Sequence, residues 1–94
     1  MNVEVGTMII KEIAKENDYN ISGEGFSFEI YKSTLRPKSF KVRKKDSDLL
    51  VYQWEDENGE YGTNAIYSLR SLNDVIKFAT LLSIGTEIRS GRNR

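Results

Sequence analysis

One stretch of this 94-residue chain carries the strongest succession of secondary-structure signals. It begins with the apolar and aromatic run Leu49–Trp54 and reaches the pair Asn58-Gly59, in which both residues tolerate positive φ. Residues 61–69 then alternate in polarity, which predicts that Tyr61 and Tyr67 share one side of the strand. Ser71 opens an apolar helical pattern with an acid three residues later, as in a capping box, and the apolar stripe of this helix is expected to include Ile76 and Leu81. The stretch predicts a strand, a tight turn, a returning strand and a capped helix that ends at Gly85, where a left-handed C-cap fits.

The N-terminal segment predicts a short strand followed by a helix. Val3 and Val5 alternate as in an edge strand, and the Thr7 hydroxyl is the expected N-cap of the helix. The helix is expected to end near Asn17, a poor helix former. Its apolar face is predicted from the spacing of Ile9, Ile10, Ile13 and Ala14.

Two further strands are expected between the first helix and Leu49. Residues 19–33 alternate with aromatic side chains on one face, and a turn is predicted where glycines interrupt them at 23–25. The only proline, Pro37, predicts another turn. Phe40 and Val42 then alternate with cationic residues, so this strand is expected to have a basic outer face.

The predicted order is helix, three or four antiparallel strands, helix, which defines a small single α+β domain over residues 1–88. Residues 89–94 are expected to form a flexible basic tail. Two amphipathic helices can cover only one face of such a sheet, so the other face is expected to be solvated. We expect Tyr52 and Trp54 to be buried against the last helix.

The charges of this chain are segregated along the sequence, although the formal net charge is zero. Residues 1–31 carry a net charge of −4, and residues 32–45 carry +7 without a single acid. Residues 46–60 carry −6 without a base, and residues 61–94 carry +3. Adjacent blocks of opposite sign predict separate charged patches on the surface.

The residue types that usually perform catalysis are missing. The chain has no histidine and no cysteine, which removes the usual general base near neutral pH, ordinary zinc sites and the standard nucleophile–base pairs. No Asp or Glu is followed two residues later by Lys, as in many metal-dependent nucleases. In a calcium loop centred on Gly59, Trp54 and Ala65 would occupy ligand positions that they cannot fill. We therefore expect no enzyme, no cofactor and no metal.

Binding to another protein is the function that the sequence favours. A patch of one charge sign steers association with a partner of the other sign, and exposed aromatic residues supply anchors. Tyr52, Trp54, Tyr61 and Tyr67 are the candidate anchors wherever they are not part of the core. The predicted acidic patch consists of Asp46, Asp48, Glu55, Asp56, Glu57 and Glu60.

Nucleic-acid binding is the alternative function. The basic strand at 38–45 and the arginine-rich C-terminus would contact phosphates, with Tyr31 or Phe40 as a stacking surface. The zero net charge and the acidic block that directly follows the strand count against it. The candidate residues are Lys38, Lys41, Arg43, Lys44, Lys45, Arg89, Arg92 and Arg94.

In size and in the expected order of helix, sheet and helix, the chain resembles phage-encoded inhibitors of host or defence proteins, anti-CRISPR proteins among them. The resemblance implies a partner that handles nucleic acid, and it directs attention to the acidic patch as an imitation of nucleic acid. The chain differs from strongly acidic mimics because it is neutral.

No apolar run approaches the roughly 18 residues of a membrane span. The first residues lack a basic region followed by an apolar segment, so we expect no signal peptide. We expect a cytoplasmic protein without a membrane partner.

Overall fold

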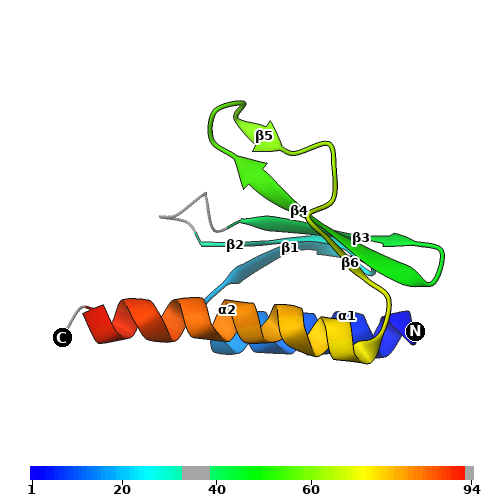
Figure 1. The fold of residues 1–94 in the computed structure, drawn as a ribbon, viewed down its shortest axis with the longest axis horizontal. Helices are drawn as coiled ribbons and strands as arrows, with labels where there is room; N and C mark the ends of the chain where they lie inside the picture. Colours follow the sequence, from blue (N-terminus) through cyan, green and yellow to red (C-terminus); the bar gives the residue numbers. More distant parts are fainter. Residues whose placement is uncertain (33–38, 93–94) are drawn as a thin grey trace.

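The computed structural model of the protein describes residues 1–32 and 39–92, which form a two-layer α+β domain (Figure 1). Both helices lie side by side on one face of an antiparallel sheet, so the predicted fold class is confirmed. The elements in chain order are α1 (Val3–Glu16), β1 (Asn20–Glu24), β2 (Ser27–Tyr31), β3 (Phe40–Lys45), β4 (Asp48–Glu55), β5 (Glu60–Tyr61), β6 (Tyr67–Leu69) and α2 (Leu72–Arg92).

The sheet formed by the described residues has six strands, in the order β1-β2-β3-β4-β5, with β6 also paired to β4. Strand β4 is central, because β3 pairs with one of its edges while β5 and β6 share the other. The strand count exceeds the predicted three or four because two predicted strands are each divided in two. Within the strand predicted at 19–33, residues 20–31 form the hairpin of β1 and β2, whose turn lies at residues 25 and 26, next to its expected position. Residues 61–69 contribute to both β5 and β6.

Helix α1 begins earlier than the sequence predicted, so the expected strand at Val3 and Val5 and the N-cap at Thr7 are wrong. Asn2 is the N-cap instead, and its Oδ1 accepts a hydrogen bond from the Val5 amide at 3.1 Å. Val3, Thr7 and the later residues Ile10 and Ala14 are buried on the same side, which extends the helical spacing back to the start of the chain. The helix ends at Glu16, as expected.

The returning strand is interrupted between β5 and β6. Tyr61 pairs with Trp54, so an uninterrupted ladder would pair Val51 with residue 64. Val51 in fact pairs with Tyr67. The chain therefore contains three residues more than an uninterrupted strand would need between these two pairs. Because side chains alternate between faces, an odd surplus places Tyr61 and Tyr67 on opposite faces of the sheet. The prediction that these two tyrosines share one side is therefore wrong.

Helix α2 begins as predicted and ends later. The Ser71 Oγ accepts a hydrogen bond from the Asp74 amide at 3.2 Å, which confirms the N-cap. The expected end at Gly85 is wrong, because the helix runs to Arg92; a glycine within a helix costs only about 1 kcal/mol and does not end it by itself. The buried stripe is also narrower than predicted, since Ile76 is 53% exposed and Leu81 is 50% exposed.

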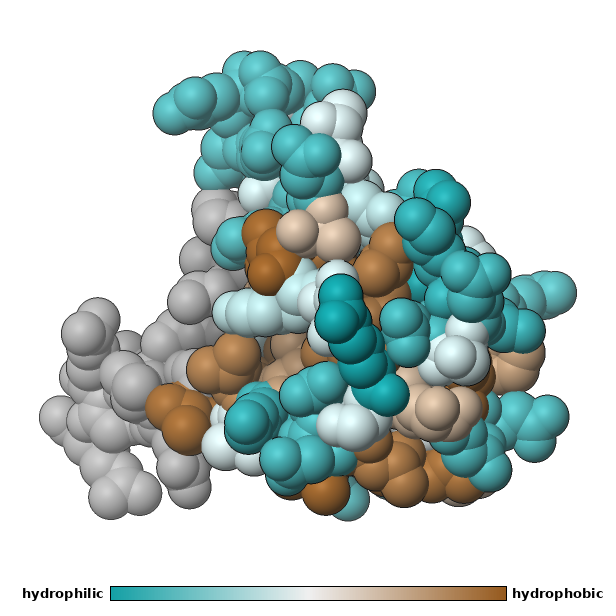
Figure 2. All heavy atoms as spheres, turned by 45° about the vertical axis from the view of Figure 1, so that its right-hand side comes forward, coloured by the Kyte–Doolittle hydropathy of each residue, from teal (hydrophilic) through white to brown (hydrophobic). Residues whose placement is uncertain are grey.

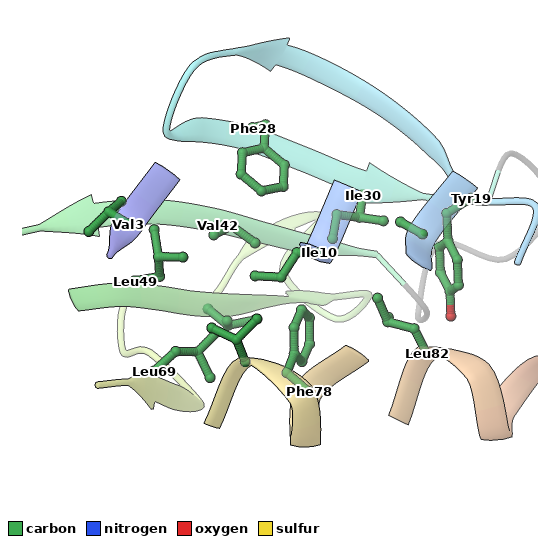
Figure 3. Close-up of a cluster of buried hydrophobic side chains, with 13 residues drawn as sticks. Val3, Ile10, Tyr19, Phe28, Ile30, Val42, Leu49, Leu69, Phe78 and Leu82 are labelled. Atoms are coloured by element: carbon green, nitrogen blue, oxygen red, sulfur yellow. The ribbon is translucent and has the colours of Figure 1, made fainter. Parts of the chain in front are cut away.

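The hydrophobic core lies between the two helices and the sheet (Figure 3). Gly6 allows the close approach of α1 to α2, because a Cβ atom at this position would lie 3.3 Å from Cγ2 of Val75. Burial of these side chains supplies the main driving force for folding. The buried cluster consists of Val3, Ile10, Ala14, Tyr19, Phe28, Ile30, Val42, Leu49, Val51, Leu69, Val75, Phe78 and Leu82.

Tyr52 and Trp54 lie on the sheet face opposite the helices, so the expectation that they pack against the last helix is wrong. Leu49 and Val51 alternate with them along β4 and are fully buried, whereas Tyr52 and Trp54 are only half-buried. Neighbouring side chains of a strand point to opposite faces. Because β4 begins apolar on both faces, its sequence did not indicate which face meets the helices.

Candidate functional site

Four of the predicted acidic residues lie together at the end of the β4–β5 hairpin, which projects from the sheet on the side away from the helices (Figure 1). The backbone amides of Asn58 and Gly59 hold the turn, since both donate to the carbonyl oxygen of Glu55, at 3.2 and 2.9 Å. Figure 2 shows hydrophilic side chains covering this projecting end of the molecule. The acidic hairpin tip is defined by four exposed residues, Glu55, Asp56, Glu57 and Glu60.

The acidic hairpin tip is structured, although its charges repel. The Trp54 and Tyr61 rings meet edge to face with centroids 5.2 Å apart at its base. The Trp54 Nε1 donates to Oδ1 of Asp56 at 3.1 Å, and this bond orients the carboxylate. Glu55 and Glu60 are directly opposite each other in the ladder, an arrangement that destabilises a pair of strands.

Asp46 and Asp48 do not join the acidic hairpin tip. They lie at the β3–β4 turn, at the other end of the eight-residue strand β4. At about 3.3 Å per residue, β4 separates the two groups of acids by roughly 23 Å. Asp48 is also directly opposite Lys45, which balances part of its charge. The acidic patch predicted from the sequence is therefore two separate groups.

The basic strand β3 has the expected solvated face, but acids face two of its three cations there. Lys41 is paired with Glu29 on β2, and Lys45 with Asp48 on β4. Arg43 is exposed and differs, because its two cross-strand neighbours are Ser27 and Leu50. Lys44 alternates with these cations, and its Nζ lies 5.3 Å from the ring centroid of Phe26.

A hollow of about 250 Å³ lies on this solvated face, where β3 approaches the β4–β5 hairpin. The Lys41 and Tyr52 positions are direct cross-strand neighbours within it. Two cations and two half-buried aromatic rings therefore face a single small space. The sheet-face hollow is lined by Lys41, Arg43, Tyr52, Tyr61, Gly62 and Thr63.

Arg89 and Arg92 of the predicted basic surface lie away from the sheet-face hollow. The backbone of Arg89 and Arg92 lies in the last turns of α2, in the helix layer on the opposite side of the sheet. Lys38 and Arg94 lie outside the described residues, as does the turn predicted at Pro37. Among the residues that the structure describes, the predicted surface on this side of the sheet therefore consists of the outward-facing side chains of β3.

Sequence reasoning missed the part that Gly62 and Thr63 play in the sheet-face hollow. Both residues follow Tyr61, at the point where the chain leaves the ladder. The Gly62 amide still donates a hydrogen bond to the Gln53 carbonyl oxygen, at 3.0 Å. It also missed an open groove of about 320 Å³ between β6 and α2, whose walls include the exposed residues Ile66 and Leu81. The run Gly62-Thr63-Asn64, rich in turn formers, was the available signal that the returning strand is interrupted.

Comparisons with protein-family models, with curated proteins and with solved structures find no match to this chain. No helix among residues 1–32 and 39–92 combines the length and the apolarity needed to cross a membrane. In the same part of the chain, no three carboxylates come together in a group that could hold a metal ion. The candidate functional features that the structure itself presents are the acidic hairpin tip and the sheet-face hollow.

Proposed function

We propose that this protein acts by non-covalent binding to another protein, and that the acidic hairpin tip inserts into a basic surface of its partner. The observation that carries the proposal is the direct opposition of Glu55 and Glu60 on an exposed, projecting hairpin. Like charges directly opposite each other destabilise a pair of strands, and a cationic partner surface would relieve this repulsion.

The proposed partner is a protein with a basic groove, such as those that handle nucleic acid. A structured acidic hairpin fits such a groove in shape and charge, and occupying the groove would inhibit the partner. A chain without cysteine does not depend on disulfides, which suits the reducing cytoplasm. We therefore propose an inhibitory binding protein of the cytoplasm that performs no catalysis of its own.

The test is capture of a partner from nuclease-treated bacterial lysate by the tagged protein and by two charge-reversed variants. The first variant carries Asp56→Lys, Glu57→Lys and Glu60→Lys at the acidic hairpin tip. The matched control carries Glu4→Lys, Glu12→Lys and Glu16→Lys, three exposed positions of α1, and changes the net charge by the same amount. We expect a protein that binds the wild type and the α1 variant, is lost with the tip variant, and weakens as salt rises.

Circular dichroism and thermal unfolding serve as controls for folding, and we expect both variants to be folded because the substituted positions are exposed. A partner that binds the tip variant as strongly as the wild type would refute the proposal. Equal loss of binding in both variants would also refute it, because only the total charge would then matter.

Nucleic-acid binding is the second candidate function, and one observation favours it. The outward-facing cations of β3 share the solvated sheet face with Tyr52 and Tyr61, and this combination of cations and rings is the one that binds single strands. Retention of nucleic acid by the protein, measured before nuclease treatment, tests this candidate in the same experiment.

A further inference from the structure

The sheet-face hollow has a floor and two unlike walls. The floor is the outer face of β4, where the half-buried Tyr52 ring lies. Lys41 and Arg43 of β3 form one wall, and Tyr61 with the chain that leaves the ladder after it forms the other. Thr63, in the interrupted part of the returning strand, belongs to this second wall.

The cationic wall suits a phosphate group. Arg43 is exposed, and its cross-strand neighbours Ser27 and Leu50 carry no charge. A guanidinium group offers its donors as a planar fork that matches phosphate geometry. Lys41, one pleat along the same face, adds a second charge, although Glu29 balances part of it.

The aromatic floor suits a planar ring. Stacking on an aromatic side chain is worth about 1–3 kcal/mol per base and does not depend on the identity of the base. Pockets for drug-sized ligands measure roughly 300–1,000 Å³. At about 250 Å³, the hollow is sized for one small planar group with its attached anion.

We infer that the sheet-face hollow binds a single nucleotide unit, with the base stacked on Tyr52 and the phosphate held by Arg43 and Lys41. This inference rests on the second candidate function and names the unit that is recognised. A free mononucleotide and one nucleotide of a single strand present the same chemistry, so both are used as probes.

The test is titration with adenosine 5′-monophosphate, inorganic phosphate and a single-stranded DNA 12-mer. Trp54 is the only tryptophan, and its ring contacts that of Tyr61, so its fluorescence reports on the hollow. Tyr52→Val removes the ring but keeps a residue that favours strands, and Tyr52→Phe keeps the ring. Arg43→Gln removes the exposed cation, and Lys15→Gln removes an exposed cation from α1 as the matched control.

We expect saturable binding of adenosine 5′-monophosphate that Tyr52→Val and Arg43→Gln each weaken by at least about fivefold. Tyr52→Phe and Lys15→Gln should change it by less than about twofold on the same scale. If Tyr52→Val failed to fold, as judged by circular dichroism, Arg43→Gln would decide the result, because its position is exposed.

Three outcomes would overturn the inference. If inorganic phosphate bound as tightly as adenosine 5′-monophosphate, stacking of the base on the Tyr52 ring would contribute nothing to binding. If only the 12-mer bound, and Tyr52→Val did not weaken its binding, recognition of a single nucleotide unit by the sheet-face hollow would be refuted. The second candidate function would still stand. Absence of binding by all three probes would refute both.

Discussion

At the scale of single residues, the β1–β2 hairpin contains two glycines with very different surroundings. Gly23 has φ +107°, and a Cβ atom there would lie 2.7 Å from the Ser27 carbonyl oxygen and 2.9 Å from the Phe28 Cα. Gly25 has φ +59°, and a Cβ atom there would meet nothing within 4 Å. Only Gly23 is therefore required both by its backbone conformation and by the approach of the facing strand.

Alanine at these two positions should consequently have unequal effects on stability. Gly25→Ala is expected to lower the free energy of unfolding by about 1 kcal/mol, because a residue with a Cβ atom is disfavoured in the left-handed conformation. Gly23→Ala is expected to cost about 3 kcal/mol or more, because a clash with backbone atoms adds to the strain. Urea unfolding of both variants measures the difference, and equal losses would show that the backbone of Ser27 and Phe28 can move aside.

At the scale of elements, the start of α2 is held by a variant of the capping box. In the usual box, the acid accepts a hydrogen bond from the N-cap amide. Here Asp74 Oδ2 accepts a hydrogen bond at 3.0 Å from the amide of Arg70, the residue before the N-cap Ser71, and the Ser71 amide has only a smaller effect on the Asp74 pKa. This bond from Arg70 is the main cause that holds the pKa of Asp74 below its ordinary value, against a smaller opposing effect of desolvation.

The lowered pKa of Asp74 predicts a pH-dependent contribution to stability. The fold favours the ionised carboxylate, so the contribution is fully present above the unfolded pKa of about 3.9. It is lost as pH falls through the lower folded pKa. Urea unfolding between pH 2 and pH 6 should show wild type more stable than Asp74→Asn at the upper end, with the difference shrinking on acidification. A difference that stayed constant with pH would contradict the assignment.

The elements themselves differ in how far the sequence predicted them. The starts of β4 and α2 carry their own signals, because a long apolar run and a Ser-x-x-Asp cap are local features. The end of α2 does not, since Gly85 is compatible with both a C-cap and a continued helix. The first turn of α1 was missed because Val3 has the same polarity in a strand as in a helix, and only packing against α2 and the sheet decides between them.

At the scale of the whole molecule, the fold class followed from the order of elements, while the candidate site did not follow from charge alone. Asp48 and Glu55 lie in one acidic block of the sequence, yet β4 holds them at its opposite ends. One wall of the sheet-face hollow lies where the ladder is interrupted between β5 and β6, and a ladder register is a long-range property that no local pattern contains.

The register also predicts the effects of two deletions. Removing residues 63–65 takes out the three surplus residues and leaves both the Trp54–Tyr61 and the Val51–Tyr67 pairs intact, so stability should change by about 1 kcal/mol or less. Removing residues 63–66 turns Leu69 away from the core and should cost roughly 2 kcal/mol or more. Urea unfolding of both variants tests this difference. Equal stabilities would contradict the prediction, because β6 could then pair with β4 in either register at no cost in stability.

Because the ladder is interrupted between β5 and β6, the segment that follows Tyr61 in one wall of the sheet-face hollow is not part of the hydrophobic core. Residues 62–66 can change in length or sequence while Tyr61 and Tyr67 keep their places in the ladder. Selection could then reshape the ligand preference of this surface without a matching loss of foldability, much as loops vary on an unchanging scaffold. The same residues are the natural place to graft a new binding sequence onto this domain.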